Sequence, residues 1–588
     1  MNAEALLTPE MKKRVDYWLQ GPFDTKTKEE VLALQVRNPQ GLIDAFFTDL
    51  SFGTGGMRAL MGVGTCRLND YTIRMATQAL ANYLHKEVKK NSLSVVVGFD
   101  SRHHSLEFAY EAARVLAGNG IRVYLLDALR PTPYISFACR FKKADAAIMI
   151  TASHNPKEYN GYKVYWSDGA QIVAPHDEGI VKEADALKDL SSVKLASLDD
   201  ALVETVKTTG GLDEEYLKAI DPLQHFPEES HKRGKELKIV YTSLHGTGIT
   251  IVPDALRRWG FTSIEYVQDQ VVPNGDFPTV SFPNPEYKEA LQMSIDLMQK
   301  SSADIAIAND PDADRIGIVA MHKGNPVLIN GNEMASICVD YLCKVLTEQK
   351  KMPAKGAFVT TIVTTELLKA IASSAGALCF EVLTGFKFIG EKIHLWETQK
   401  TGEEFIFGAE ESYGYLLGTH ARDKDAIIAS CLIAEIALYA KIQGKTLIDL
   451  LHDIYRMLGI YREKQVSLNF KAGKEGMEQM ASLMQRLRQN PPVEIAGKKV
   501  VVMEDYERKE RCDLLTQKKE PLDLPKSDVL LFRLEDASRL VIRPSGTEPK
   551  VKIYGSASTQ QFASIEEGIT ACDAKLEQII AALKGICG

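Results

Sequence analysis

The stretch ADAAIMITASHNP, residues Ala144–Pro156, indicates both the fold class and a first candidate site. Its first half is an uninterrupted apolar run, which is typical of a strand buried on both faces of a sheet. Its second half changes to polar residues and a proline, which indicates a loop. Ligands of α/β proteins bind at the carboxyl ends of such strands. Ser153 therefore lies where a ligand is expected, although an ordinary polar turn would explain Ser-His-Asn equally well.

The order strand, loop, helix, glycine, strand occurs three times in the chain. The copies have their first strand, helix and second strand at residues 94–100, 106–117 and 121–126; at 237–243, 253–259 and 263–267; and at 357–361, 366–373 and 378–383. Ser105 is predicted to be the N-cap of the first of these helices. Such βαβ units predict three similar α/β domains, related by duplication or alike because the unit is common.

The last part of the chain has a different pattern. Helices are predicted at residues 473–488 and 560–583, strands at 498–503, 529–534, 540–542 and 551–554, and an exposed charged loop at 508–526. This mixture predicts an α+β domain. Since a domain has about 150 residues, a chain of 588 residues predicts four domains, and we expect them at residues 1–205, 206–325, 326–460 and 461–588.

The composition excludes some partners and favours a compartment. Lys and Arg number 70 and Asp and Glu 78, so the net charge is −8, which would repel nucleic acid and anionic membranes. The nine cysteines contain no C-x-x-C pair, which favours a reducing compartment. The first twenty residues lack the apolar region of a signal peptide, and no apolar run reaches the length of a membrane span. A cytoplasmic location is therefore expected.

A second candidate loop, DPDADR, follows another predicted buried strand. It places Asp310, Asp312 and Asp314 at alternate positions, followed by Arg315. Three carboxylates that converge in a turn suit Mg²⁺, which prefers oxygen ligands. An EF-hand is excluded because the glycine and the final glutamate of that loop are missing. The alternative is a solvated acidic turn.

Two further loops complete a set of four. GAEESYGY (Gly408–Tyr415) offers carboxylates and a hydroxyl for sugar hydroxyl groups, and RPSGTEPK (Arg543–Lys550) offers an arginine, hydroxyls and backbone amides for a phosphate. Each of these loops alone is also compatible with a surface turn. However, the four loops fall in four different predicted domains and together predict phosphoryl transfer to a sugar.

These loops and several further segments resemble the phosphohexomutase superfamily, and within it the long phosphoglucomutase/phosphopentomutase branch. The matching segments occur in the family's order and are FGTGGMR (Phe52–Arg58), TASHNP (Thr151–Pro156), GYK (Gly161–Lys163), DPDADR (Asp310–Arg315), LTGFKFIG (Leu383–Gly390), GAEESYGY (Gly408–Tyr415), RDKD (Arg422–Asp425) and RPSGTEPK (Arg543–Lys550). They extend over most of the chain. One departure is Gly55-Gly56, where relatives often have alanine or serine.

The resemblance implies an α/β fold of three similar domains with mixed sheets plus a C-terminal α+β domain, arranged around a central cleft. Residues 1–205 would form the phosphoserine domain with an N-terminal helical extension. Residues 206–325 would bind the metal, 326–460 the sugar and 461–588 a phosphate group.

The resemblance also implies roles for individual residues. Ser153 would carry a phosphate, His154 or Lys163 would be the general acid/base, and Arg58 would be a further positive group of the active site. The implied ligands of Mg²⁺ are the Ser153 phosphate, Asp310, Asp312 and Asp314. The implied substrate contacts are Arg315, Thr384, Gly385, Glu410, Ser412, Lys424, Arg543, Ser545, Gly546 and Thr547.

The activity that the resemblance implies is the exchange of glucose 1-phosphate and glucose 6-phosphate, with Mg²⁺ and glucose 1,6-bisphosphate as cofactor and intermediate. The Glu410-Glu411-Ser412 triplet resembles glucose-type members more than mannose-type ones. Phosphopentomutase, glucose 1,6-bisphosphate synthase and phosphomannomutase are alternatives within the family. A phosphatase, and a binding protein without activity, are alternatives outside it. Sugar phosphates are the expected partners, and no obligate protein partner is expected.

Overall fold

The computed structural model describes residues 7–50, 52, 55–187, 189–471, 474–545 and 550–587. The chain forms two compact units. Unit 1 comprises residues 1–330, 386–402 and 412–442, and unit 2 comprises residues 331–385, 403–411 and 443–588. The predicted four-domain division follows sequence order, so this division by spatial contact does not test it, and it stays a prediction.

The first sheet lies in unit 1 and has the strand order β1-β5-β4-β2-β3-β6. Its strands are β1 (Gly56–Leu60), β2 (Ser94–Phe99), β3 (Arg122–Leu126), β4 (Ala146–Ile150), β5 (Tyr159–Trp166) and β6 (Val203–Val206). Strands β2, β3, β4 and β6 are parallel, whereas β5 and β1 are added antiparallel beyond β4. The surrounding helices are α4 (Asp70–Glu87), α5 (Ser105–Gly118), α6 (Thr132–Lys142) and α7 (His176–Ala186).

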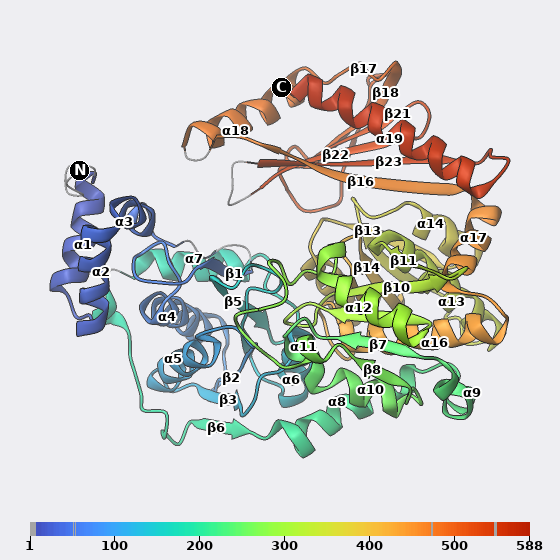
Figure 1. The fold of residues 1–588 in the computed structure, drawn as a ribbon. Helices are drawn as coiled ribbons and strands as arrows, with labels where there is room; N and C mark the ends of the chain where they lie inside the picture. Colours follow the sequence, from blue (N-terminus) through green and yellow to red (C-terminus); the bar gives the residue numbers. More distant parts are fainter. Residues whose placement is uncertain are drawn as a thin grey trace. The chain divides into compact units, whose positions relative to one another are not determined.

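Helices cover both faces of this sheet, which explains the unbroken apolar run of β4 (Figure 1). On one face, Val95 and Ile148 pack in one core with residues of α4 and α5. On the other face, Gly98 lies so close to Ile135 of α6 that an added Cβ would come within 2.2 Å of that side chain. Since both faces of such a strand are buried, apolar residues are favoured at every position, and apolar and polar residues do not alternate.

The helix after β2 begins differently from the prediction. Ser105 is its first helical residue, and the preceding N-cap residue is His104, which has a φ of 62° and no capping hydrogen bond. The Ser105 hydroxyl donates instead to Asp100 Oδ1 at 2.7 Å. The prediction of Ser105 as N-cap was therefore wrong, because a buried carboxylate takes the hydroxyl that would have capped the helix.

The second and third repeats have the strand order of the first. In the second, β9 (Ile305–Asn309), β7 (Ile239–Thr242) and β8 (Ile264–Tyr266) are parallel, and β10 (Ile316–His322) and β11 (Asn325–Ile329) are antiparallel beyond β9. In the third, β14 (Glu404–Glu410), β12 (Gly356–Thr361) and β13 (Leu378–Val382) are parallel. In each repeat the first strand is central and the third is followed by a candidate loop. The prediction of three similar α/β units is confirmed.

The remaining helices of the repeats divide between the units. Unit 1 contains α8 (Asp213–Ile220), α9 (Pro227–Arg233), α10 (Val252–Arg258), α11 (Gln268–Val271), α12 (Lys288–Ser301), α15 (Phe386–Gln399) and α16 (Ala426–Ile442), and also the strand β15 (Gly414–Leu417). Unit 2 contains α13 (Gly331–Glu348), α14 (Leu367–Ser374) and α17 (Leu447–Leu458).

Three helices precede the first sheet in unit 1: α1 (Pro9–Gln20), α2 (Thr25–Arg37) and α3 (Pro39–Phe46). Their apolar faces share a core in which Trp18 stacks on Phe23 and meets Tyr71 of α4 edge-on. The Tyr71 hydroxyl also donates to Asp24 Oδ2 at 2.5 Å. The predicted N-terminal helical extension is thus packed onto the first repeat by aromatic side chains.

The C-terminal part of unit 2 is an antiparallel sheet with the order β16-β23-β22-β21-β18-β19-β20. Its elements are β16 (Ile460–Asn469), β17 (Glu494–Ile495), β18 (Lys498–Asp505), β19 (Glu510–Asp513), β20 (Lys519–Pro521), β21 (Leu530–Leu534), β22 (Arg539–Pro544) and β23 (Lys550–Thr559), with the helices α18 (Lys474–Gln489) and α19 (Ile565–Cys587). Figure 1 shows α19 lying along this sheet, whose core it completes. The α+β prediction is confirmed.

Two sequence predictions in this region were incomplete. The charged segment 508–526 was predicted to be a loop, but it contains the short strands β19 and β20. Strand β16 was not predicted at all, yet it pairs with β23 over its whole length. Both segments are rich in charged residues because they are largely solvent-accessible, so they lack the apolar signal of a buried strand.

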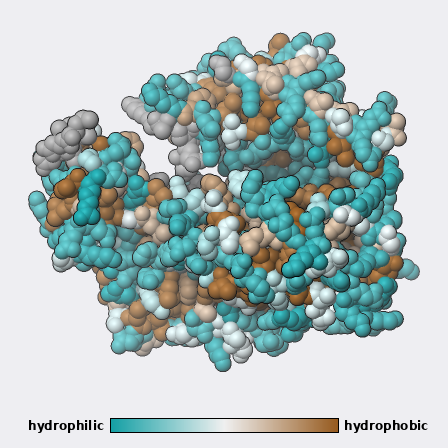
Figure 2. Space-filling model, viewed as in Figure 1, coloured by the Kyte–Doolittle hydropathy of each residue, from teal (hydrophilic) through white to brown (hydrophobic). Residues whose placement is uncertain are grey.

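Hydrophobic and hydrophilic residues are interspersed over the face shown in Figure 2. Within the part of the chain that the structure describes, no single helix is long and apolar enough to cross a membrane, and only the pair α16 and α17, which is bent, has a sufficient combined length and composition.

Candidate active site

Ser153 lies in the loop between β4 and β5. Its φ of 53° is in the left-handed region, which few residues other than glycine adopt. Its amide donates to Thr151 Oγ1 at 2.8 Å, and its hydroxyl donates to Asp310 Oδ2 at 2.8 Å. The residue is only 2% exposed. The loop therefore fixes the serine hydroxyl beside a carboxylate of the second repeat.

The predicted aspartate cluster forms in the loop after β9. One carboxylate oxygen from each of Asp310, Asp312 and Asp314 lies within 4.8 Å of the others, and all three residues are buried. Ala313 between the last two has a φ of 48°, which turns the chain so that alternate side chains converge. Among the described residues no other group of acidic, histidine or cysteine side chains has the geometry to hold a metal ion.

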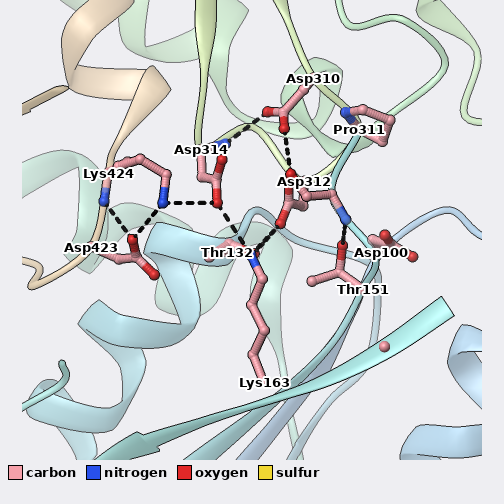
Figure 3. A network of polar contacts seen from close by, with 12 residues as sticks. Asp100, Thr132, Thr151, Lys163, Asp310, Pro311, Asp312, Asp314, Asp423 and Lys424 are labelled. Carbon is pink, nitrogen blue, oxygen red and sulfur yellow. Dashed lines mark hydrogen bonds and ion pairs between the residues drawn. The ribbon is translucent and has the colours of Figure 1, made fainter. Parts of the chain in front are cut away.

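Two lysines balance the charge of the cluster (Figure 3). Lys163 Nζ, from β5, lies 2.8 Å from Asp312 Oδ2 and 3.2 Å from Asp314 Oδ2. Lys424 Nζ lies 3.3 Å from Asp314 Oδ2 and 3.0 Å from Asp423 Oδ1. The two ammonium groups thus approach the cluster on the side of Asp312 and Asp314.

This asymmetry separates the pKa values of the aspartates. Burial and the neighbouring carboxylates raise the pKa of Asp310 well above its usual value. Burial would also raise the pKa of Asp314, but Lys424, Lys163 and Arg315 outweigh it and hold that pKa below its usual range. Burial opposes the charge of Lys163, but Asp312 and Asp314 outweigh it and raise its pKa. Lys163 is therefore a protonated group at neutral pH.

The cluster has the donor set that Mg²⁺ requires. Asp314 Oδ1 is buried and has no hydrogen-bond partner among the described residues. A buried carboxylate oxygen without a partner is costly unless a cation balances it. Oxygen ligands of this kind suit a hard divalent cation. The residues present therefore fit the predicted metal, and Asp310, Asp312 and Asp314 are the side chains that would hold it.

Arg58 lies on β1, which pairs with β5 so that Gly56 is opposite Lys163. Its guanidinium donates to Asn155 Oδ1 at 2.9 Å, beside the serine loop. Gly56 has a φ of 134°, and an added Cβ would lie 1.8 Å from the Tyr162 carbonyl oxygen. The glycine is thus required by the close approach of β1 and β5, which places Arg58 and Lys163 near each other.

His154 and Arg315 lie beside the same cluster. His154 Nδ1 is 3.1 Å from Ser153 Oγ. Burial and the charges of Arg315 and Arg58 lower the pKa of His154 well below its usual value, so the imidazole is neutral at pH 7. The Arg315 guanidinium forms an ion pair with Glu286, and its backbone amide donates to Asp310 Oδ1 at 3.0 Å. Arg315 thus helps to hold the aspartate loop.

Unit 2 contains a second set of predicted residues. Glu410 is the last residue of β14 and is 5% exposed, and its Oε1 accepts a 2.9 Å hydrogen bond from the Gly385 amide. The neighbouring Thr384 Oγ1 is buried and has no partner in the described part of the chain. Glu411 accepts hydrogen bonds from Thr361 and Thr364. Threonine, glutamate and backbone groups therefore come together at the carboxyl end of this third sheet.

Arg543 lies at the end of β22, in the same unit. Its side chain hydrogen-bonds Tyr554 of β23, and burial and the charge of Glu411 raise the pKa of that tyrosine. The Ser545 amide donates to the Lys550 carbonyl oxygen at 2.8 Å. Gly546 and Thr547, which the sequence also places in this loop, lie outside the described residues. Ser412 lies in unit 1 with Lys424 rather than with Glu410.

The sequence analysis missed several residues that shape these sites. The Thr132 amide donates to the Asp312 carbonyl oxygen at 2.8 Å, and the Thr132 hydroxyl donates to Asp312 Oδ2 at 2.7 Å. It follows β3, so its place after a strand was an available signal. Tyr554 meets Arg543 because β23 pairs with β22, and Asp423, which lies in the RDKD segment but was given no role, forms an ion pair with the neighbouring Lys424. Local sequence patterns do not reveal such contacts.

Comparisons with known proteins agree with this geometry. The chain matches three family models described as phosphoglucomutase/phosphomannomutase alpha/beta/alpha domain I at residues 49–190, domain II at 214–324 and domain III at 330–458. It is 39% identical to a phosphoglucomutase of Staphylococcus haemolyticus, over 89% of this chain and 93% of the relative. It is 37% identical to a phosphoglucomutase of Staphylococcus aureus, over 90% and 93% respectively.

Solved structures show the same fold. A putative phosphomannomutase from Thermus thermophilus superposes with a TM-score of 0.67 at 22% identity, over 92% of this chain and 99% of the other. The open form of Paramecium parafusin, a phosphoglucomutase, superposes with a TM-score of 0.66 at 20% identity, over 91% and 95% respectively.

Proposed function

Because the chain belongs to the phosphoglucomutase/phosphomannomutase family, we propose that it interconverts glucose 1-phosphate and glucose 6-phosphate through a phosphate carried on Ser153. The observation that supports this most strongly is the Ser153 hydroxyl held 2.8 Å from Asp310, beside three convergent aspartates. The names of the relatives that match about nine-tenths of the chain favour glucose as the sugar.

The proposed reaction has two phosphoryl transfers. In the first, the bond between phosphorus and Ser153 Oγ breaks, and a bond from phosphorus to O6 of glucose 1-phosphate forms. The sugar hydroxyl loses its proton, and Ser153 Oγ gains one. In the second, the bond between phosphorus and O1 of the 1,6-bisphosphate breaks and a bond from phosphorus to Ser153 Oγ forms. Ser153 Oγ loses its proton, O1 gains one, and glucose 6-phosphate remains. The bisphosphate is thus the intermediate, and added bisphosphate restores any serine that has lost its phosphate.

The residues around Ser153 suit different parts of this reaction. Neutral His154, 3.1 Å from Oγ, is able to accept the hydroxyl proton when the serine attacks. Lys163 keeps its proton and neutralises oxygens that gain negative charge. Arg58 adds a further positive charge at the edge of the serine loop. Lys163 and His154 are thus assigned complementary roles rather than a single shared one.

The three aspartates are proposed to bind Mg²⁺, together with an oxygen of the Ser153 phosphate. When bound, the ion would supply positive charge to the phosphoryl group during transfer. Phosphoserine carries a charge of about −1.5 to −2 at neutral pH, so the cluster requires a cation in addition to its lysines.

The remaining predicted residues are proposed to bind the substrate. Glu410 and Thr384 offer oxygen atoms to sugar hydroxyls, and Arg543 offers a guanidinium to the phosphate that does not react. The further proposed contacts are Gly385, Arg315, Ser412, Lys424, Ser545, Gly546 and Thr547. The four domains at residues 1–205, 206–325, 326–460 and 461–588 are proposed to contribute one of the four loops each.

A cytoplasmic location is also proposed. All nine cysteines lie in the described part of the chain and are free thiols, which suits a reducing compartment. Sugar phosphates are the proposed partners.

A coupled mutase assay over hexose and pentose 1-phosphates, with and without Mg²⁺ and glucose 1,6-bisphosphate, tests the function. The proposal expects Mg²⁺-dependent turnover that is fastest with glucose 1-phosphate, and a phosphate on the Ser153 peptide by mass spectrometry. Faster turnover of ribose 1-phosphate would assign a phosphopentomutase instead, and accumulation of bisphosphate would assign a synthase. Release of inorganic phosphate alone would assign a phosphatase. No turnover and no phosphoserine would overturn the proposal.

A further inference from the structure

Arg102 is a fully buried arginine that lies against the main chain of the serine loop. Its guanidinium has no exposed surface. Nη2 donates to the carbonyl oxygens of Ser153 at 2.6 Å and Asn155 at 2.5 Å, and Nη1 donates to those of Pro156 at 2.8 Å and Tyr159 at 2.9 Å. One side chain thus binds four carbonyl groups within seven residues. No motif of the sequence analysis included it.

The guanidinium is itself held from two other directions. Asp100 Oδ1 accepts a hydrogen bond from the Arg102 amide at 2.9 Å, and Asp100 Oδ2 lies 3.5 Å from Arg102 Nε. The ring of Phe277 lies 5.0 Å from the guanidinium carbon, from a loop of the second repeat. Burying an arginine costs free energy unless its charge and donors are matched. Here the four carbonyls match the Nη1 and Nη2 donors, and the carboxylate and the aromatic ring balance the charge, while Nε makes no hydrogen bond.

The serine loop needs such an anchor because its conformation is strained. A residue other than glycine in the left-handed region is strained and persists only where its surroundings fix it. Ser153 has a φ of 53° and its own carbonyl is bound by Arg102. A relaxed Ser153 would turn its hydroxyl away from Asp310.

The same contact also orients the next amide group. Since the carbonyl and the amide hydrogen of a planar trans peptide point in opposite directions, the Ser153 carbonyl that binds Arg102 directs the His154 amide away from it. That amide has no acceptor among the described residues. It is therefore available to an oxygen of a phosphate on Ser153.

We propose that Arg102 is a positioning residue for phosphoryl transfer: it binds four carbonyls of the serine loop and so holds the Ser153 hydroxyl and the His154 amide in the orientation that accepts and gives the phosphate. Arg102 touches neither substrate nor metal, and it acts through Ser153. The inference rests on the proposed mutase function. It assigns Asp100 and Phe277 as the residues that hold Arg102 in turn.

Arg102→Lys is the first test, because lysine keeps the charge but lacks the fork of donors. Its kcat should fall about ten- to a hundredfold, as expected for a displaced reacting group, while KM for glucose 1-phosphate changes less than about twofold. The rate at which Ser153 takes up phosphate from glucose 1,6-bisphosphate should fall by the same factor. Unchanged kcat, or a loss in KM alone, would overturn the proposal.

Arg130→Lys is the matched control. Arg130 is also buried, forms an ion pair with Asp213, donates to the Leu129 carbonyl and lies over the ring of Tyr134, but it has no recorded contact with the serine loop. The Arg130→Lys variant should lower the thermal midpoint about as much as Arg102→Lys does. Its rate of phosphate uptake should stay within about twofold of the wild-type rate. Equal losses in the two variants would show a general stability effect and overturn the proposal.

Phe277→Leu provides a test if Arg102→Lys does not fold. It keeps every hydrogen bond of Arg102 and removes only the ring against the guanidinium, so kcat should fall about two- to fivefold at unchanged KM. No change in kcat would overturn the proposal. Wild-type protein that takes up no phosphate from the bisphosphate would overturn the mutase function and this inference together, whereas normal uptake by wild type and by Arg102→Lys would overturn only the role of Arg102.

Discussion

The serine and aspartate site of unit 1 and the threonine, glutamate and arginine set of unit 2 are stabilised in different ways. In unit 1, Lys163 contacts Asp312 and Asp314, and Lys424 contacts Asp314 and Asp423, at 2.8 to 3.3 Å. In unit 2, Glu410 accepts a hydrogen bond from the Gly385 amide, and Arg543 hydrogen-bonds the Tyr554 hydroxyl.

The difference is instructive because it separates chemistry from recognition. Fixed charges placed before the reaction lower the cost of moving a phosphoryl group, so the site around Ser153 is built from paired charges. An uncharged polar group without a partner keeps its hydrogen-bonding capacity for a substrate. Thr384 Oγ1, buried without a partner among the described residues, is an example. We therefore expect substitutions in unit 1 to lower kcat, and substitutions in unit 2 to act also on KM.

Ser153→Ala should produce the largest effect. It removes the atom that carries the phosphate, so kcat should fall by more than about 10³-fold while the fold remains intact. The measurements are the coupled assay, the intact mass and the thermal midpoint. Ser294→Ala is the control, because Ser294 of α12 is equally buried and its hydroxyl has no partner among the described residues. A Ser153→Ala enzyme with wild-type kcat would remove the phosphoserine from the mechanism.

Asp312→Asn tests the charge balance of unit 1. It removes one negative charge beside Lys163 and weakens the oxygen set, so Mg²⁺ affinity should fall roughly 10- to 100-fold, with a similar loss in kcat. Titration calorimetry with Mg²⁺ measures the first quantity, and removal of Mg²⁺ by a chelator should stop turnover of the wild type. Asp296→Asn, at an exposed position of α12, is the control. Equal Mg²⁺ affinity in all three proteins would place the metal elsewhere and leave the aspartates as an acidic turn.

Arg543→Ala tests whether unit 2 recognises a phosphate. A bidentate contact between a guanidinium and a phosphate is worth about 1.5–3 kcal/mol, which corresponds to roughly ten- to a hundredfold in binding. KM for glucose 1-phosphate should rise by this factor, and kcat should fall because the contact is also needed for the bisphosphate intermediate. The variant should depend more on added glucose 1,6-bisphosphate, since it releases the intermediate more readily.

Arg543→Lys is the companion variant, because it keeps the charge without the fork and should lie between wild type and Arg543→Ala. Constants that stay at wild-type values with and without added bisphosphate would show that another residue binds this phosphate. A loss in kcat alone would break the comparison between the two units.

The sequence was sufficient for the elements that carry apolar patterns and the loops that follow them. The strands β2, β4, β7, β9 and β12 are buried runs, so their ends and the loops with Ser153 and Asp310 were predictable. Strand β16 was not, because its exposed residues are charged and only its pairing with β23 makes it a strand. The N-cap of α5 was predicted wrongly because the Ser105 hydroxyl donates to the buried carboxylate of Asp100, five residues earlier, and not to the helix backbone.

The same limit applies to the candidate site. The identity of Ser153 and the aspartates follows from local order along the chain. The contacts of Arg102 and Thr132 depend on segments that are distant in sequence, and that of Tyr554 depends on the pairing of β22 with β23, so the local pattern predicts none of them. The RPSGTEPK loop shows a further limit: the sequence assigns Gly546 and Thr547 to it, and they lie outside the described residues, so these two remain predictions.

The smallest predicted effect concerns a carboxyl group of unit 2 that lacks the lysine partners of unit 1. Burial raises the pKa of Glu463 on β16 from its ordinary 4.5 to about 7, against the opposing effects of a hydrogen bond from Thr365 and the charges of Arg539 and Arg462. Glu333 adds to the upward shift. Glu463 Oε1 has no partner among the described residues, in contrast to the oxygens that Lys163 and Lys424 contact.

The direction of the pH dependence follows from this pKa. Between pH 4.5 and 7 the folded protein binds the Glu463 proton more tightly than the unfolded chain does, so stability falls as the pH rises through this range and then stays lower. The loss is on the order of 1–3 kcal/mol, which corresponds to about 2–8 °C in the thermal midpoint. Glu463→Gln imitates the protonated form, so it should match wild type at pH 5 and exceed it by this amount at pH 8. Calorimetry of both proteins at the two pH values is the measurement, with Glu494→Gln, at the exposed position of β17, as the control. If wild type and Glu463→Gln respond equally to pH, Glu463 is ionised in the fold, and the charged partners of unit 2 match their carboxylates as completely as those of unit 1 do.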